Sequence, residues 1–268
     1  MSKEKIFGVV GCGWLGLSMA QKWIKEDMSV LGTTTTKEKI KSLEAEGIIA
    51  YLLENKQDEK DLKWLKQVDV LLLNIPPSGL KEEYANLMLK IAKQIKTDAK
   101  IIFISSTSVY ANNNKEVTEE SELEETRKNS AYIINAEQSL LDFAKERLSI
   151  IRMSGLVGKE RNPAKYMQGR NVSGGNEPVN LIHLEDCMGI IDHIINNSIW
   201  GEIFNASTQE HPSKKEYYTY AAKQLNIDPP VFNDKSQSYK TINSDKLIKK
   251  FGYTFKYADP FDFPIEIS

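Results

Sequence analysis

The segment Ile6-Phe-Gly-Val-Val10-Gly11-Cys-Gly-Trp-Leu-Gly16 decides the fold. Its first five residues predict a short strand, and residues 15–24 predict an amphipathic helix. Between them, Gly11, Gly13 and Gly16 have the spacing Gly-x-Gly-x-x-Gly. The first glycine permits a tight turn, the second lets a pyrophosphate approach the backbone, and the third lets helix and strand pack closely. Because helix N-termini bind phosphates through their amides, this unit predicts dinucleotide binding, with a purely structural turn as the alternative.

The same alternation of strand and helix continues through the first half of the chain. Apolar runs without alternation are typical of strands buried on both faces of a parallel sheet. Further strands are predicted at 29–35, 48–53, 68–75, 100–105 and 148–152, with helices at 37–46, 82–95 and 131–147. This succession predicts an α/β fold, a Rossmann-type doubly wound parallel sheet with a small C-terminal substrate lobe.

The second half has longer connections. Residues 112–129 and 162–178 are polar and are expected to be surface loops. Strands are predicted at 179–182 and 202–205, and helices at 184–196, 213–225 and 244–251. We expect residues 1–153 to form the dinucleotide-binding core, with 179–206 completing the sheet. Residues 154–178 and 207–268 would form the small substrate-binding lobe.

Composition excludes several classes of protein. The chain has 268 residues, a net charge of −2 and only two cysteines, Cys12 and Cys187. The near-neutral charge gives no global attraction to nucleic acid, and two cysteines with three scattered histidines predict no metal site. No apolar stretch approaches the roughly 18 residues of a membrane span, and no signal-peptide pattern follows Met1. We therefore expect a cytoplasmic protein of open oligomeric state, with a small-molecule substrate and no nucleic-acid or membrane partner.

The end of the second strand bears on the choice of cofactor. A site for NAD is expected to have Asp or Glu here, to bind the 2′-hydroxyl of the ribose. The sequence is Gly32-Thr-Thr-Thr-Thr36-Lys37, without an acid. Hydroxyl groups with a nearby lysine suit a 2′-phosphate better, so NADP is favoured and NAD is the alternative. The threonines are also good strand formers, which is an equally simple reason for their presence.

Ligands of open parallel sheets bind outside the carboxyl ends of the strands. The fourth strand ends at Asn74-Ile-Pro-Pro77, which either lines the cofactor or simply stops the strand. The predicted cofactor-binding residues are Gly11, Cys12, Gly13, Trp14, Leu15, Gly16, Thr33, Thr34, Thr35, Lys37, Asn74, Ile75, Pro76 and Ser105.

The fifth strand carries a family-specific pattern, Ile104-Ser-Ser-Thr-Ser-Val-Tyr110. It resembles the extended short-chain dehydrogenase/reductase family, which includes nucleotide-sugar epimerases and dehydratases. Residues 152–158, 180–186, 201–205 and 243–252 resemble further segments of that family. The glycine motif and the Pro-Pro pair after the fourth strand resemble in particular its atypical, YeeZ-like branch.

The resemblance implies a catalytic Ser, and a Tyr with a Lys four residues later. Ser106 matches the serine and would orient a substrate oxygen, and Tyr132 lies in the region of the tyrosine. The position four residues later is Ala136, so the lysine is missing. A second alignment uses the Ala-Glu-Gln segment that begins at Ala136. It puts Ile133 at the position of the family lysine and Asn129 at the position of the tyrosine. Lys128 lies four residues before Tyr132 and could substitute on the same helix face, but a solvated junction of loop and helix at Arg127 and Lys128 is the favoured interpretation.

Three functional hypotheses remain open. The first is an NADP(H)-dependent oxidoreductase, or a protein similar to nucleotide-sugar epimerases and dehydratases, whose active site lacks the family lysine. The second is a non-catalytic dinucleotide-sensing or regulatory protein of the same fold. The third is a β-hydroxyacid dehydrogenase of the 6-phosphogluconate type, which would have a helical C-terminal domain. The strands predicted at 179–182 and 202–205 argue against the third.

Overall fold

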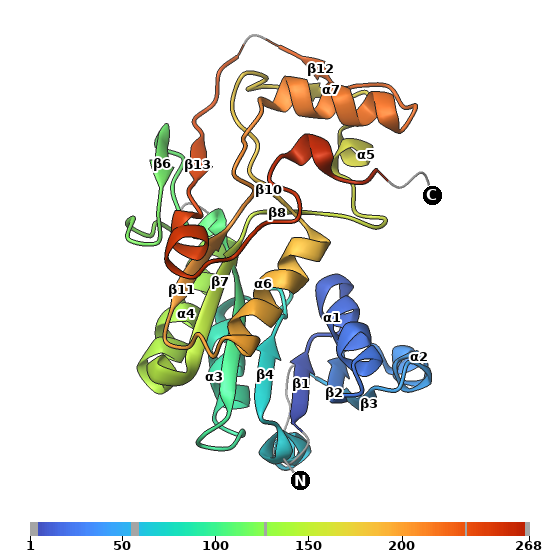
Figure 1. Cartoon of the computed structure of the whole chain (residues 1–268), viewed down its shortest axis with the longest axis vertical. Helices are drawn as coiled ribbons and strands as arrows, with labels where there is room; N and C mark the ends of the chain where they lie inside the picture. Colours follow the sequence, from blue (N-terminus) through green and yellow to red (C-terminus); the bar gives the residue numbers. More distant parts are fainter. Residues whose placement is uncertain (1–4, 55–58, 126–127, 234, 266–268) are drawn as a thin grey trace. The chain divides into compact units, whose positions relative to one another are not determined.

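The computed structural model describes residues 5–54, 59–125, 128–233 and 235–265 (Figure 1). Seven strands form one parallel sheet in the order β11-β7-β5-β4-β1-β2-β3. They are β1 (Ile6–Val10), β2 (Ser29–Thr34), β3 (Ile49–Leu52), β4 (Val70–Leu73), β5 (Lys100–Ser106), β7 (Leu148–Met153) and β11 (Ile203–Ala206). The predicted α/β, Rossmann-type sheet is therefore confirmed.

The strand order reverses between β1 and β4. The chain first moves outward from β1 to β2 and β3, and then returns to pair β4 with the other side of β1, with Val10 beside Leu73. At such a switch point the loops after the two strands diverge and leave a crevice, which is where ligands of these sheets bind. The glycine loop follows β1 directly, so the topology positions it at this crevice.

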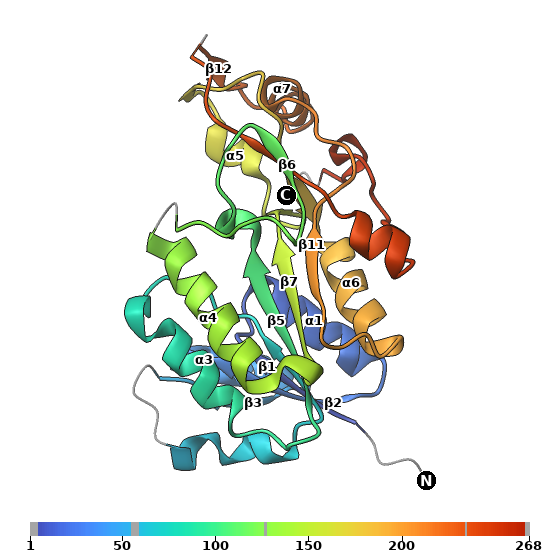
Figure 2. The same cartoon turned by 90° about the vertical axis from the view of Figure 1, so that its left-hand side faces the viewer.

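Helices cover the sheet of the first half on both sides. Figure 2 shows α3 (Tyr84–Ala92) and α4 (Lys128–Ala144) on one side of the strands and α1 (Trp14–Lys25) on the other. Trp23 of α1 packs on Phe7 with ring centroids 4.5 Å apart. The other helical segments of this half are η1 (Lys37–Lys39), α2 (Ile40–Ala45), η2 (Glu59–Gln67), η3 (Lys81–Glu83) and η5 (Lys145–Arg147).

The chain divides into two compact units. The first comprises residues 1–105, 127–151 and 194–203, and the second comprises 106–126, 152–193 and 204–268. The second unit contains three parallel pairs of short strands: β6 (Lys115–Val117) with β13 (Lys240–Ile242), β8 (Gly155–Val157) with β10 (Leu181–His183), and β9 (Asn171–Val172) with β12 (Val231–Phe232). Its helical segments are η4 (Thr107–Val109), α5 (Pro163–Met167), α6 (Leu184–Asn196, which continues into the first unit from Ile194), α7 (Lys214–Gln224), the π-helix η6 (Lys246–Lys250) and η7 (Pro260–Asp262).

Both segments that we expected to be loops contain regular structure. Residues 112–129 include β6, and residues 162–178 include α5 and β9, so the expectation of continuous loops is wrong there. The reason is that these strands have only two or three residues and pair with segments far along the chain, Lys115 with Lys240 and Asn171 with Val231. Such pairing leaves no local periodicity in the sequence.

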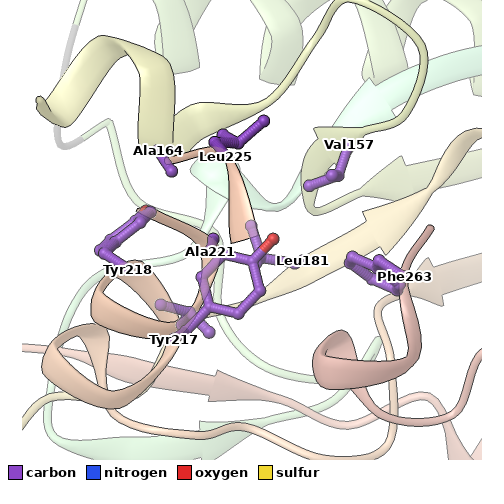
Figure 3. Close-up of a cluster of buried hydrophobic side chains, with 9 residues drawn as sticks. Val157, Ala164, Leu181, Tyr217, Tyr218, Ala221, Leu225 and Phe263 are labelled. Atoms are coloured by element: carbon purple, nitrogen blue, oxygen red, sulfur yellow. The ribbon is translucent and has the colours of Figure 1, made fainter. Parts of the chain in front are cut away.

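A cluster of buried side chains forms the core of the second unit (Figure 3). Tyr217 of α7 is 1% exposed and lies at its centre. The other members are Val157, Ala164, Val179, Leu181, Tyr218, Ala221, Leu225 and Phe263. Helix α7 begins with a capping box, in which Ser213 and Glu216 each bond the other's backbone amide. This box fixes the start of the helix and hence the direction of its buried face. Within the described residues, no helix combines the length and apolarity needed to cross a membrane.

We predict that Tyr217→Ala lowers the free energy of unfolding by about 3–5 kcal/mol, because it removes a large buried aromatic side chain and leaves a cavity. The measurement is urea denaturation followed by circular dichroism. Tyr166→Ala is the matched control, since Tyr166 is 63% exposed and its loss should change the free energy by under about 0.5 kcal/mol. Equal effects of the two substitutions would contradict the packing of Tyr217 at the centre of this core.

Candidate functional site: the glycine loop and its neighbours

Two glycines of the motif leave no room for a side chain. Gly11 has φ of +103°, and a Cβ atom there would lie 2.7 Å from the carbonyl oxygen of Asn74. A Cβ atom at Gly16 would lie 2.1 Å from the carbonyl oxygen of Gly11. These contacts join the loop after β1 to the end of β4 and to the first turn of α1. Gly11 and Gly16 are therefore needed by the protein's own packing.

Gly13 differs from both. It is exposed, and a Cβ atom built on it meets no atom of the described chain within 4 Å. Gly13 is also the N-cap of α1, where it offers no side chain to bond the first amides, and the first turn contains no acidic residue. The amides and the positive end of the helix dipole therefore face an open approach without a nearby carboxylate, an arrangement that fits a pyrophosphate.

The end of β2 holds the glycine loop in place. The Gly11 amide donates to the Thr33 hydroxyl at 2.9 Å, and the Cys12 amide donates to the Thr33 carbonyl at 2.8 Å. Thr33 is 1% exposed, so its hydroxyl shapes the loop from inside. Burial raises the pKa of the Cys12 thiol to about 11, so at neutral pH the side chain is a neutral, space-filling group. It faces Gly32, where a Cβ atom would lie 2.5 Å from its sulfur.

The residues that follow Thr34 are turned outward. The Thr34 hydroxyl accepts the Thr36 amide at 3.1 Å and closes the turn after β2. Thr35 and Lys37 are exposed, and Lys37 begins the short helix η1. Of the predicted residues at this strand end, these two have side chains accessible to a ligand.

Asn74 and Ile75 hold neighbouring segments through their backbone groups and through the side-chain amide of Asn74. The Asn74 amide donates to the Val10 carbonyl at 2.9 Å, and its side-chain nitrogen donates to the Gly11 carbonyl at 3.3 Å. The Ile75 carbonyl accepts the Tyr84 hydroxyl at 2.8 Å. Pro76 is exposed beyond them. Asn74 thus fixes the glycine loop from the β4 side, as Thr33 does from the β2 side.

A buried carboxylate lies beside the carboxyl end of β5. The Ser105 hydroxyl donates to Oε1 of Glu137 at 2.5 Å, and the two residues are 5% and 2% exposed. The Ser105 hydroxyl is therefore engaged with Glu137. Burial, together with the charge of Glu137, raises the pKa of the fully buried Tyr84. Sequence reasoning did not select Glu137 as a site residue. The available signal was the Ala-Glu-Gln segment that contains it, which served only to align the family motif.

Ser106, the predicted catalytic serine, lies in the second unit. Its hydroxyl accepts the Ser108 amide at 3.1 Å and caps η4. That bond uses a lone pair and leaves the hydroxyl hydrogen for another acceptor. Tyr110, from the same motif, is buried and structural, since its hydroxyl donates to Asn205 and accepts from Arg152, each at 2.7 Å.

Tyr132, the predicted catalytic tyrosine, lies in the first unit on α4. Its hydroxyl donates to Oε1 of Glu82 at 3.0 Å. Desolvation, followed by the hydrogen bond and negative charge of Glu82, raises the pKa of Tyr132. The two alternative lysine positions, Ala136 and Ile133, are buried apolar residues at 0% and 6% exposure. The Lys128 side chain, proposed as a substitute, lies outside the described residues.

The chain is similar to known proteins over its whole length. A family model for the NAD binding domain of 6-phosphogluconate dehydrogenase matches residues 6–149. Protein YeeZ of Escherichia coli K12 is 29% identical, and the alignment covers 98% of this chain and 100% of that protein. A functionally unknown conserved protein from Silicibacter pomeroyi has a similar structure, with a TM-score of 0.79, 18% identity and coverage of 96% and 95%. The UDP-glucuronic acid 4-epimerase of Bacillus cereus in complex with NAD has a TM-score of 0.78, 17% identity and the same coverage.

These comparisons confirm the resemblance to the YeeZ-like branch and the fold shared with nucleotide-sugar epimerases. They also qualify the third hypothesis. The dehydrogenase model matches the N-terminal half, but the second unit contains the strand pairs β8–β10 and β9–β12 among its described residues. These strands lie beyond the matched region, where that hypothesis required a helical C-terminal domain.

We predict effects of different size when a methyl group is added at two glycines of the motif. Gly16→Ala should destabilise the protein by about 1–3 kcal/mol, because its Cβ atom overlaps the Gly11 carbonyl. Gly13→Ala should change the stability by under about 1 kcal/mol, because nothing in the described chain opposes its Cβ atom. Thermal and urea denaturation of the two variants provide the measurement. If Gly13→Ala were as unstable as Gly16→Ala, the distinction between an open Gly13 and a packed Gly16 would be contradicted.

Proposed function

We propose that this chain, which belongs to the family of the NAD binding domain of 6-phosphogluconate dehydrogenase, is an oxidoreductase that uses NADP(H) on a small-molecule substrate. The observation that carries the proposal is Gly13, which is exposed at the start of α1 and whose Cβ position meets no atom of the described chain within 4 Å. A glycine there is explained by a pyrophosphate that must approach the backbone.

Each residue of the site has a proposed task. The first amides of α1 bind the pyrophosphate, and Gly13 leaves the room for it. Thr33 and Asn74 keep the glycine loop in the binding conformation through their bonds to Gly11. A bound nicotinamide would supply or accept a hydride. Ser106 orients the oxygen of the substrate, because its hydroxyl hydrogen is not used in capping η4.

NADP is the proposed cofactor and NAD is the alternative. Thr35 and Lys37 are exposed beyond β2, where they can contact a 2′-phosphate, and no carboxylate lies between Gly32 and Lys37 to repel it. A carboxylate at this strand end is the feature that would have favoured the 2′-hydroxyl of NAD.

The proposed substrate class is a nucleotide-sugar, handled in the cytoplasm without a nucleic-acid or membrane partner. Support for it comes from the fold, which the UDP-glucuronic acid 4-epimerase of Bacillus cereus shares. Tyr132 is the proposed proton donor in the direction of reduction. Its raised pKa keeps the phenol protonated at neutral pH, which suits a donor and disfavours a base.

A non-catalytic dinucleotide sensor is the second candidate, and one observation favours it. Both alternative lysine positions are occupied by buried apolar side chains, Ala136 and Ile133. An ammonium group that could lower the pKa of a tyrosine is therefore absent from these two positions of α4.

We predict that NADPH binds more tightly than NADH and that Lys37→Ala removes this preference. Loss of a charged hydrogen bond to the 2′-phosphate should weaken NADPH binding about tenfold and leave NADH binding unchanged. Nicotinamide fluorescence titrations measure both affinities. Lys41→Ala is the control, since Lys41 is exposed on the neighbouring α2. Absence of saturable binding by either cofactor would refute the proposed function, whereas an unchanged NADPH affinity in Lys37→Ala would refute only the role of Lys37.

We predict that Tyr132→Phe lowers kcat about 100-fold in the direction of reduction, the usual contribution of a general acid. Because Glu82 raises the pKa of Tyr132, the alkaline limb of the pH–rate profile should lie above the ordinary tyrosine range. Glu82→Gln should move this limb to lower pH by removing the charge.

The assay uses a panel of sugar nucleotides with carbonyl groups, and Ser106→Ala serves as a second variant with lowered kcat. Unchanged turnover in Tyr132→Phe would exclude Tyr132 as the donor. If the wild-type protein binds NADPH but turns over no compound of the panel, the sensor hypothesis gains support.

A further inference from the structure

The second unit contains a small polar pocket of its own. It lies between the turn that follows β9 and the segment that follows β12, and Glu177, Lys215, Phe232 and Lys235 are among its lining residues. Its volume is about 80 Å³. Since one water needs roughly 10–15 Å³ on this measure, the pocket accommodates several non-hydrogen atoms of a ligand.

Glu177 is a buried carboxylate with only one of its oxygens satisfied. The residue is 5% exposed. Its Oε1 accepts the Gln237 amide at 2.7 Å, whereas Oε2 has no hydrogen-bond partner within the described part of the chain. A buried charged oxygen without a donor is costly, so such groups are rare and call for an explanation.

The backbone holds this carboxylate in a fixed position. The Glu177 amide donates to the Gly174 carbonyl at 3.2 Å, and its carbonyl accepts the Lys214 amide at 2.9 Å. The Gly174 amide in turn donates to the Lys235 carbonyl at 2.8 Å. The turn after β9, the start of α7 and the segment after β12 are thus tied together around the unsatisfied oxygen.

Oε2 of Glu177 occupies the space that a side chain at Gly174 would fill. A Cβ atom at Gly174 would lie 2.1 Å from Oε2 of Glu177 and 3.1 Å from the ammonium nitrogen of Lys214. Its φ of +76° also favours glycine. The neighbouring Gly175 packs against the Phe232 ring, where a Cβ atom would lie 3.1 Å from Cδ1. The acceptor oxygen of Glu177 and the ammonium group of Lys214 therefore lie on the same side of Gly174.

The charges around the pocket select the chemistry of its ligand. Lys215 and Lys235 are exposed on its lining, so a cationic ligand would be repelled. An anionic group is attracted by the two ammonium groups. The unsatisfied Oε2 of Glu177 calls for a donor, and a hydroxyl group supplies one without adding a positive charge beside Lys214, Lys215 and Lys235.

We propose that this pocket binds a small hydroxylated phosphate: the Glu177 side chain turns so that its unsatisfied oxygen accepts one hydroxyl, and the phosphate lies beside Lys215 and Lys235. The pocket lies entirely within the second unit, and the proposal does not rest on the NADP(H) reaction. It gives the chain a second ligand site, distinct in its residues from the glycine loop.

The test uses the full chain and three probes: glycerol 3-phosphate, glycerol and inorganic phosphate. Titrations are followed by amide NMR, with Gly174 and Gln237 as reporters because their amides bond to the pocket's frame. Only glycerol 3-phosphate carries both determinants, so it should bind at least tenfold more tightly than either of the other probes.

Glu177→Gln is the main variant. It should keep a side-chain oxygen for the Gln237 amide, weaken glycerol 3-phosphate binding at least tenfold, and leave the Tm of the free protein unchanged or higher, because an unpartnered buried charge is removed. The double variant Lys215→Ala with Lys235→Ala should also weaken binding. Lys223→Ala, an exposed lysine of the same helix α7, is the control and should bind like the wild type.

Two outcomes would overturn the proposal. One is the absence of any shift at Gly174 and Gln237 with glycerol 3-phosphate at millimolar concentration. The other is equal binding of inorganic phosphate together with unaltered affinity in Glu177→Gln, which would reduce the pocket to a pair of surface lysines. Neither outcome depends on whether NADPH binds.

Discussion

The structure of the first unit depends on the close approach of three backbone segments at the strand switch point. The Gly11 carbonyl lies so near the first turn of α1 that Gly16 can have no side chain, and the Asn74 carbonyl at the end of β4 likewise leaves no room for one at Gly11. Thr33 and Asn74 bond the same loop from the two neighbouring strands. Because the loop is held from both sides, the amides that follow it have a fixed direction without any ligand. Such preorganisation lowers the entropic cost of binding.

This arrangement separates glycines of two kinds within one motif. Gly11 and Gly16 are explained by contacts inside the protein, so they would be required in a purely structural turn. Gly13 has no such contact within the described chain, and it stands at the one position where a phosphate reaches the backbone. The structural alternative accounts for the first two glycines and explains the third only by the preference for glycine at a helix N-cap, which Ser, Thr, Asp and Asn share. The functional alternative accounts for all three.

The sequence predicted those features that depend on local patterns. Strand β1, helix α1 and the glycine turn follow from apolar runs and motif spacing, and the parallel sheet follows from the alternation of strands and helices. The strands of two or three residues, such as β9 and β12, could not be predicted, because pairing between distant segments defines them.

The same limit applies to the site. Their places at the ends of the second and fourth strands indicated that Thr33 and Asn74 belong to it. These places could not indicate that both residues bond Gly11 rather than face a ligand. Glu137 was overlooked because a charged residue on a helix is normally solvated. Its burial against Ser105 is decided by the packing of α4 on the sheet, which no local pattern encodes.

Glu137 and Glu177 are both buried carboxylates, and their surroundings differ in an informative way. Glu137 receives the Ser105 hydroxyl at 2.5 Å, so this chain does supply a donor where a buried carboxylate serves its own fold. Glu177 is fixed through its backbone and Oε1, and yet its second oxygen lies against Gly174 without a donor. Because the fold gains nothing from an unsatisfied buried oxygen, this oxygen is better explained by a donor that arrives with a ligand.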